Sequence, residues 1–327
     1  MNRLDDAVAH LSFKGYSIKS SRSLSGGVNN SVYELICSDG SRKVLKLYPS
    51  PTVRDSRTRG ELEISFYKYL HKLDLHNVPS ILDYDSEMQW CLITWIDGQR
   101  LSNFDFRYLS KVANFIRDIN LSNSLADRQR LPFASDACVS LSQVLDSISE
   151  RILSFDSISF KSPIAVEAAK FIAKHIKPYF ESLRNNLLPN TSMHHWSDCN
   201  LLYVASPSDI GINNIIEHAG ELYFYDFEYA GLDDLSKLAS DLIVHPEFPL
   251  SQSQAMYFLD ELTVQVLGAD KPTWRRRVND LLPIFVVKWS LILLNKLKVN
   301  QLTDSQLQKA ISYFQVMSCN CSILSAL

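Results

Sequence analysis

Residues 203–241 read YVASPSDIGINNIIEHAGELYFYDFEYAGLDDLSKLASD, and this stretch concentrates acidic and amide side chains. Two apolar runs, Leu201–Ala205 and Leu222–Tyr225, have the length and composition typical of short strands. Asp209 lies just past the first run, and Asp226 directly follows the second. Strands that end in this way are expected to deliver both carboxylates to one edge of a sheet.

An amide side chain stands between the two acids, since Asn214 comes five residues after Asp209. A tight turn lets the residues on its two sides pair as a short hairpin, Ile215–Ile216 with Leu222–Phe224. This hairpin is expected to bring Asn214 beside Asp226. Carboxylate and amide oxygens are hard ligands suited to Mg²⁺. The alternative is an ordinary loop, because Asp, Asn, Ser and Pro all favour turns.

With this spacing the chain resembles the aminoglycoside phosphotransferase and choline kinase group of protein-kinase-like enzymes, whose catalytic loop runs Asp, four residues, Asn, hairpin, Asp. The wording SPSDIGINN and YDFEYAGLDD is more similar to a subgroup of that family than to the antibiotic-resistance enzymes. The resemblance implies a kinase that transfers the γ-phosphoryl group of ATP to a hydroxyl of a small molecule. Asp209 would orient or deprotonate the acceptor, and Asn214 and Asp226 would hold Mg²⁺. Glu228 is a further candidate carboxylate for the metal.

One departure from the family pattern precedes Asp209. The family usually has His-Gly there, whereas this chain has Pro207-Ser208. That histidine normally supports the metal loop by hydrogen bonding, which proline cannot do, so Asp226 needs another support. The departure motivates a second hypothesis, a catalytically inactive kinase-like protein that binds a nucleotide or another ligand.

A glycine pair predicts the phosphate side of the nucleotide site. Gly26 and Gly27 precede the strand Val32–Cys37, and glycines let backbone N–H groups approach phosphates closely. A plain hairpin turn explains the same pattern equally well.

Lys46 lies in the strand sequence KVLKLY, between residues that are typical of a core. A buried ammonium needs an anion. Glu63, 17 residues further on, is the predicted partner, as in the Lys–Glu pair of kinase-like sites. Glu61 is the competitor, but it would point about 200° away from Glu63 on an ideal helix. The alternative is a lysine that reaches solvent from an edge strand.

The run QWCLITWIDG ends the β-rich part of the chain. By resemblance, the segment Thr94, Trp95 and Ile96 is the hinge whose backbone hydrogen-bonds the adenine ring.

The order of patterns predicts an α+β fold, a protein-kinase-like bilobal fold with a β-rich N-lobe and a mostly α-helical C-lobe. Short alternating runs fill Leu24–Ile96, and one helix, Arg59–Leu73, interrupts them. The predicted domains are an N-lobe at 1–97 and a C-lobe at 98–327. The longer helical patterns of the C-lobe are Phe104–Leu121, Val139–Phe155 and Ile164–Leu187.

Composition limits the partners. A net charge of −3 and a pI near 6.2 give no positive field for a polyanion, so we expect no nucleic-acid partner. The N-terminus has no signal-peptide pattern, and the apolar runs LLPIFVV and WSLILL fall short of the roughly 20 residues of a membrane span. We therefore expect a cytoplasmic protein without a membrane partner; the sequence makes no prediction of oligomeric state.

Histidines and cysteines give no metal site by pattern. The six cysteines show no disulfide or zinc spacing, so we expect them to be reduced. His194 and His195 favour a structural or acceptor-contacting role over metal binding, because adjacent residues of an extended loop face different directions.

Overall fold

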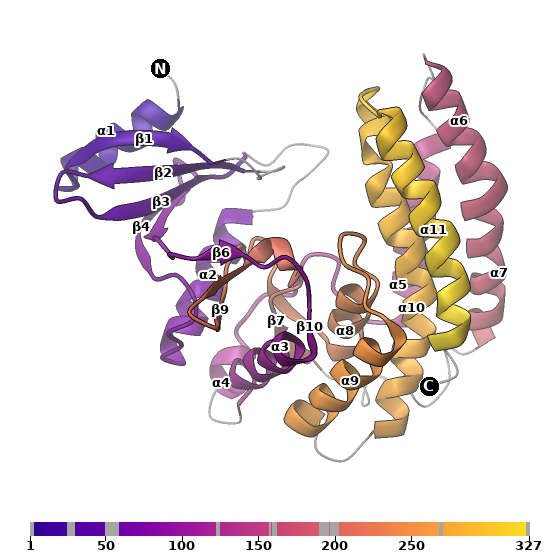
Figure 1. The fold of residues 1–327 in the computed structure, drawn as a ribbon. Helices are drawn as coiled ribbons and strands as arrows, with labels where there is room; N and C mark the ends of the chain where they lie inside the picture. Colours follow the sequence, from indigo (N-terminus) through magenta and orange to yellow (C-terminus); the bar gives the residue numbers. More distant parts are fainter. Residues whose placement is uncertain are drawn as a thin grey trace. The chain divides into compact units, whose positions relative to one another are not determined.

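The computed structural model describes residues 3–24, 30–49, 59–121, 125–156, 158, 162–189, 196, 203–267 and 271–324. Figure 1 shows the helices and strands of the chain, coloured from indigo at the N-terminus to yellow at the C-terminus. The chain forms two compact units. The first comprises Met1–Ser102, Asp118–Ser135 and Ala205–Leu232, and the second comprises Asn103–Arg117, Asp136–Val204 and Asp233–Leu327. The units interleave along the chain, whereas the sequence predicted a single division after Asp97. The predicted hairpin therefore clusters with the β-rich segment.

The first unit contains a five-stranded antiparallel sheet with the order β1-β2-β3-β5-β4. The predicted strands around SVYELI, KVLKLY and WCLITWI are confirmed as its β2, β3 and β5. The strands are β1 (Ile18–Ser23), β2 (Ser31–Cys37), β3 (Arg42–Leu47), β4 (Ile81–Asp85) and β5 (Trp90–Thr94).

Alternation along β3 separates an apolar face from a polar one. Leu45 and Leu47 pack with Ala7 and Leu11 of α1 (Arg3–Phe13) in one hydrophobic cluster. Because successive side chains of a strand point to opposite faces, Lys46 lies on the other face of the sheet. The pleat thus directs Lys46 away from the cluster that contains α1.

The helix predicted at Arg59–Leu73 is confirmed as α2 (Arg59–Lys72). Its buried face includes Phe66, Tyr67 and Leu70. The rings of Phe66 and Tyr67 lie 5.2 and 5.1 Å from the ring of Phe227, in centroid distance. This aromatic contact fixes α2 against the residue that follows Asp226.

The predicted hairpin is confirmed, but the expectation that both apolar runs end at one edge of a sheet is wrong. β8 (Ile215–His218) pairs with β9 (Glu221–Phe224), and β6 (Gln99–Arg100) pairs with the other edge of β8. β7 (Tyr203–Ser206) instead pairs with β10 (Gly231–Asp234) in a separate two-stranded sheet. The two apolar runs expected at one sheet edge thus lie in different sheets, because β9 pairs with the strand nearest in sequence.

Helices make up most of the described part of the second unit. α10 contacts α5, α7, α8 and α11. The helices are α3 (Phe106–Asp118), α5 (Leu141–Asp156), α6 (Pro163–Phe171), α7 (Lys177–Leu187), α8 (Leu235–Ile243), α9 (Gln252–Leu262), α10 (Lys271–Leu293) and α11 (Asp304–Leu324); a short helix, α4 (Leu125–Arg128), belongs to the first unit.

In the described ranges, one helical stretch, Thr273–Val299, is long and apolar enough to cross a membrane by length and composition. The same properties are typical of the core helix of a soluble protein, and 61% of its most apolar window is buried. The predicted cytoplasmic location stays a prediction.

A buried ionic network joins α8 to α10. Lys237 Nζ lies 2.7 Å from Asp233 Oδ2 and 3.2 Å from Asp241 Oδ2, and Lys288 of α10 pairs with the other oxygen of Asp241. Lys237 and Lys288 together hold the pKa of Asp241 below its ordinary value although burial alone would raise it. The charges of this network are therefore matched inside the second unit.

We predict that Gly98→Ala lowers the free energy of unfolding by about 2 kcal/mol or more. Gly98 has φ +135°, and a Cβ atom there would lie 2.4 Å from the carbonyl oxygen of Glu217. Gly220→Ala is the matched control, because Gly220 also has positive φ (+82°) and no atom within 4 Å of that Cβ position. Urea unfolding would measure both, and equal losses would show that the Glu217 contact contributes nothing.

Candidate active site

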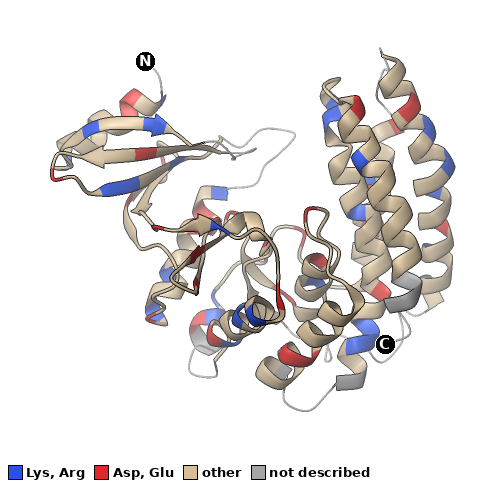
Figure 2. Cartoon of the chain, viewed as in Figure 1, with Lys and Arg blue, Asp and Glu red and all other residues tan. Residues whose placement is uncertain are grey.

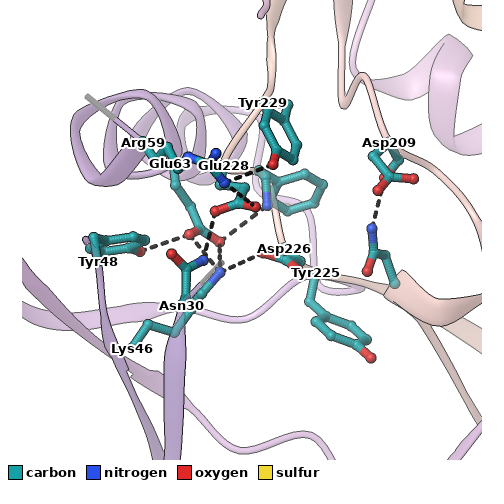
Figure 3. A network of polar contacts seen from close by, with 12 residues as sticks. Asn30, Lys46, Tyr48, Arg59, Glu63, Asp209, Tyr225, Asp226, Glu228 and Tyr229 are labelled. Atoms are coloured by element: carbon teal, nitrogen blue, oxygen red, sulfur yellow. Dashed lines mark hydrogen bonds and ion pairs between the residues drawn. The ribbon is translucent and has the colours of Figure 1, made fainter. Parts of the chain in front are cut away.

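The predicted Lys46–Glu63 pair is present in the structure (Figure 3). Lys46 Nζ donates to Glu63 Oε1 at 2.7 Å and to Oε2 at 2.6 Å. Glu63 is 0% exposed, whereas its competitor Glu61 lies on the exposed side of α2. The helix thus turns only the predicted glutamate toward Lys46.

Two further groups hold the Glu63 carboxylate. Tyr48 donates its hydroxyl to Oε2 at 2.7 Å, and the backbone N–H of Phe227 donates to Oε1 at 3.1 Å. Gly60 allows α2 to lie against the Tyr48 ring, since a Cβ atom there would be 2.7 Å from Tyr48 Cδ2. Sequence reasoning missed Tyr48; the available signal was its spacing of two residues from Lys46, which places both on one face.

The charges of this pair depend on burial and on each other. Burial alone would lower the pKa of Lys46, but the carboxylates of Asp226 and Glu63 outweigh it and hold that pKa above its ordinary value. Burial raises the pKa of the Glu63 carboxyl, and the nearby Lys46 opposes that rise. Lys46 is therefore a firmly protonated cation.

Lys46 also reaches Asp226. Its Nζ atom lies 2.6 Å from Asp226 Oδ1, and the Asp226 side chain is 34% exposed (Figure 3). Asp226 has φ +69°, a conformation that non-glycine residues rarely adopt outside functional sites and tight turns. The lysine thus joins a fully buried glutamate to an aspartate that solvent can reach.

Backbone hydrogen bonds on both sides of Asp226 provide the support that Pro207 cannot. The N–H of Tyr225 donates to the carbonyl of Asn214 at 3.1 Å, and the N–H of Phe227 donates to Glu63. The first of these bonds continues the ladder of the β8–β9 hairpin past its last pair, Ile215 with Phe224. The hairpin therefore brings Asn214 and Asp226 to its open end.

Hydrogen bonds between its own residues stabilise the loop that contains Asp209. Asn214 Nδ2 donates to the carbonyl of Asp209 at 3.1 Å, and the N–H of Asp209 donates to the carbonyl of Pro207 at 2.8 Å. Ser208 has φ +64°, and its N–H donates to the hydroxyl of buried Ser206 at 3.0 Å. The sequence Pro207-Ser208 thus forms a defined turn that leads into Asp209.

Glu228 does not have the surroundings of a metal ligand. It accepts a hydrogen bond from Asn30 Nδ2 at 2.7 Å and pairs with Arg59 Nη1 at 3.2 Å. The Arg59 guanidinium already occupies the position beside Glu228 that a metal ion would need. Glu228 is therefore not a suitable metal ligand.

The residues that fit a magnesium ion are Asn214 and Asp226. Asn214 uses its Nδ2 atom toward Asp209, which leaves the amide oxygen as an acceptor. Asp226 is a partly exposed carboxylate. Among the described residues no group of three or more His, Cys, Asp or Glu could hold a metal. One amide oxygen and one carboxylate suit Mg²⁺, which keeps waters and substrate phosphates as its other ligands.

The hinge prediction is narrowed by one hydrogen bond. The N–H of Thr94 donates to the carbonyl of Ser80 at 2.9 Å, and the Thr94 hydroxyl accepts from the Ser80 N–H. The Thr94 N–H is thus not available to an adenine ring, so a hinge N–H donor would have to come from Trp95 or Ile96. Gly26, Gly27, His194 and His195 lie outside the described residues, so their predicted roles stay predictions.

We predict that Lys46→Met lowers the free energy of unfolding by about 3–5 kcal/mol, because it leaves the Glu63 carboxylate buried without its cation. Adding Glu63→Gln should recover part of that loss, since the carboxylate is then neutral. Urea unfolding of the two single variants and the double variant would measure the coupling. Strictly additive losses would contradict it.

A family model matches part of the chain. Residues 20–134 match the model of the phosphotransferase enzyme family. No curated protein sequence matches the chain.

Solved structures share the fold over nearly the whole chain. A choline/ethanolamine kinase family protein from Mesorhizobium loti is 18% identical, with a TM-score of 0.62 over 99% of this chain and 95% of that one. A spectinomycin phosphotransferase in complex with ADP and spectinomycin is 13% identical, with a TM-score of 0.64 over 98% of each chain. A choline kinase from Cryptosporidium parvum is 14% identical, with a TM-score of 0.63 over 93% of this chain and 89% of that one.

These matches confirm the predicted resemblance and the predicted α+β, protein-kinase-like fold. The predicted enzyme class, a phosphotransferase, agrees with the description of the matched family model. The chain therefore has the fold of the aminoglycoside phosphotransferases and choline kinases, and its residues 20–134 match the phosphotransferase enzyme family.

Proposed function

We propose that this protein transfers the γ-phosphoryl group of ATP to a hydroxyl of a small molecule, with Mg²⁺ as the metal. The contact that carries the proposal is the one from Lys46 Nζ to Asp226 Oδ1, at 2.6 Å. This contact places the Lys46 ammonium, which is suited to bind phosphate oxygens, beside the Asp226 carboxylate, which is suited to bind a metal ion. A phosphoryl-transfer site needs both next to the same phosphates.

Each residue then has a role in the transfer. Lys46 binds phosphate oxygens of the nucleotide, and Asn214 and Asp226 would hold the magnesium ion. A bound magnesium ion would neutralise charge on the phosphate oxygens. Asp209 orients the acceptor hydroxyl and takes its proton as the hydroxyl oxygen bonds to the γ-phosphorus. The bond to the β–γ bridging oxygen breaks and ADP leaves. Positioning and electrostatics supply the rate.

The choice of ATP and of a small acceptor is supported by the similar structures. One of them is a complex with ADP and spectinomycin, and another is a ternary complex with streptomycin and ATP. Ethanolamine and choline kinases are also among them. In the described helices of this chain, Lys and Arg are interspersed with Asp and Glu (Figure 2), which supports a small molecule over a nucleic acid. A panel of amino alcohols, aminoglycosides and sugars would identify the acceptor through ADP formation.

We predict that Asp209→Asn lowers kcat by about 10²–10⁴-fold and leaves ATP affinity nearly unchanged. The variant keeps the size of the side chain and removes the proton-accepting charge. Turnover with a competent acceptor and calorimetric ATP affinity would be measured together. Asn213→Ala, an exposed neighbour in the same loop, is the control and should keep turnover. An unchanged kcat in Asp209→Asn would contradict the proposal.

We predict that Asp226→Ala abolishes turnover and weakens ATP binding only when Mg²⁺ is present. The reason is the loss of the carboxylate that would hold the metal. Calorimetry with Mg²⁺ and with EDTA separates the two conditions. Phosphorylation of an acceptor at near the wild-type rate would refute the metal assignment. A protein that binds ATP but turns over no acceptor would instead favour the inactive, ligand-binding alternative.

A further inference from the structure

Glu228 is a buried carboxylate that the proposed transfer does not use. It is 4% exposed and lies two residues after Asp226. One oxygen, Oε2, accepts from Asn30 Nδ2 at 2.7 Å, and the other, Oε1, is 3.2 Å from Arg59 Nη1 (Figure 3). Both oxygens thus already have donors from other parts of the first unit.

The two donors lie at the starts of β2 and α2. Asn30 directly precedes Ser31, the first residue of β2. Arg59 is the first residue of α2, the helix that carries Glu63. Glu228 therefore connects the residues after Asp226 with the starts of β2 and α2.

Arg59 is itself held in one orientation. It is 6% exposed, and its Nη1 atom also donates to the Tyr229 hydroxyl at 2.7 Å. Its guanidinium carbon lies 5.0 Å from the centre of the Tyr229 ring, in a cation–π contact. The cation is thus fixed beside Glu228, where it neutralises that carboxylate and opposes a metal ion.

We propose that Glu228 is a positioning residue, which acts through Asn30 and Arg59 to hold β2 and α2 in place relative to Asp226. β2 pairs with the strand of Lys46, and α2 carries Glu63. This inference rests on the proposed function, because it assumes that ATP binds at this site. It differs from a metal-ligand role for Glu228 in one measurable respect. A positioning residue affects nucleotide binding whether or not a metal is present.

The test is calorimetric ATP affinity, measured once with Mg²⁺ and once with EDTA, for the wild type, Glu228→Gln, Arg59→Met and the double variant. We expect Glu228→Gln to weaken ATP binding about tenfold in both conditions. A tenfold change is within the range of interaction energies measured between residues in contact. Arg59→Met should also weaken ATP binding. The double variant should lose less binding free energy than the sum of the losses in the two single variants. A loss confined to Mg²⁺ would overturn the inference and make Glu228 a metal ligand.

Controls separate positioning from loss of folding. Arg277→Met breaks a buried ion pair of the same length, 3.2 Å to Asp234, in the second unit. It should lower the thermal unfolding temperature without changing ATP affinity. Asn30→Ala keeps the Arg59–Glu228 ion pair, so it tests the proposal even if Glu228→Gln does not fold. We expect it to weaken ATP binding in EDTA. Unchanged affinity in Asn30→Ala would overturn the proposal. A wild-type protein that does not bind ATP would refute the proposed function instead.

Discussion

The buried carboxylate of Glu63 is the constraint on which the candidate site depends. It accepts hydrogen bonds from Lys46, Tyr48 and the backbone of Phe227. A carboxylate without solvent must have such partners, since an unpaired buried charge is strongly destabilising. Satisfying this one group therefore fixes β3, α2 and the residue after Asp226 relative to each other, and the positions of Lys46 and Asp226 follow.

The charges around Glu63 are arranged so that one cation serves two carboxylates. Lys46 pairs with Glu63, which is buried, and with Asp226, which is partly exposed. Glu63 is held by donors of the protein, whereas Asp226 is the partly exposed carboxylate that we propose as the metal ligand. The strained backbone of Asp226 is consistent with this, because it is held by neighbours on both sides rather than by its own preference. The buried Glu63 thus fixes Lys46, and Lys46 in turn positions the Asp226 carboxylate.

Local patterns in the sequence predicted much of this arrangement. The spacing of Asp209, Asn214 and Asp226 and the hairpin turn predicted the loop. The helical period implied that only one of Glu63 and Glu61 could face Lys46, and the resemblance to kinase-like sites favoured Glu63. The strands and α2 also follow from such patterns, because they depend on residues close in sequence.

Contacts between distant segments could not be read in this way. The Phe227 backbone bond to Glu63 spans 164 residues, and Glu228 meets Asn30 across 198. No periodicity encodes such pairs, so the sequence predicted Glu228 as a candidate metal ligand although Arg59 lies beside it. The pairing of β7 with β10 rather than with the β9 run was missed for the same reason.

The most direct test of the Glu63 constraint is amide hydrogen exchange of Glu63→Gln, with Glu61→Gln as the matched control on the same helix. The change keeps the shape of the side chain and removes the charge that Lys46 and the Phe227 N–H share. We expect faster exchange of the peptide containing Phe227, and wild-type exchange there in Glu61→Gln, while β1 is unchanged in both. Wild-type exchange at Phe227 in Glu63→Gln would contradict the claim that this carboxylate holds the site together.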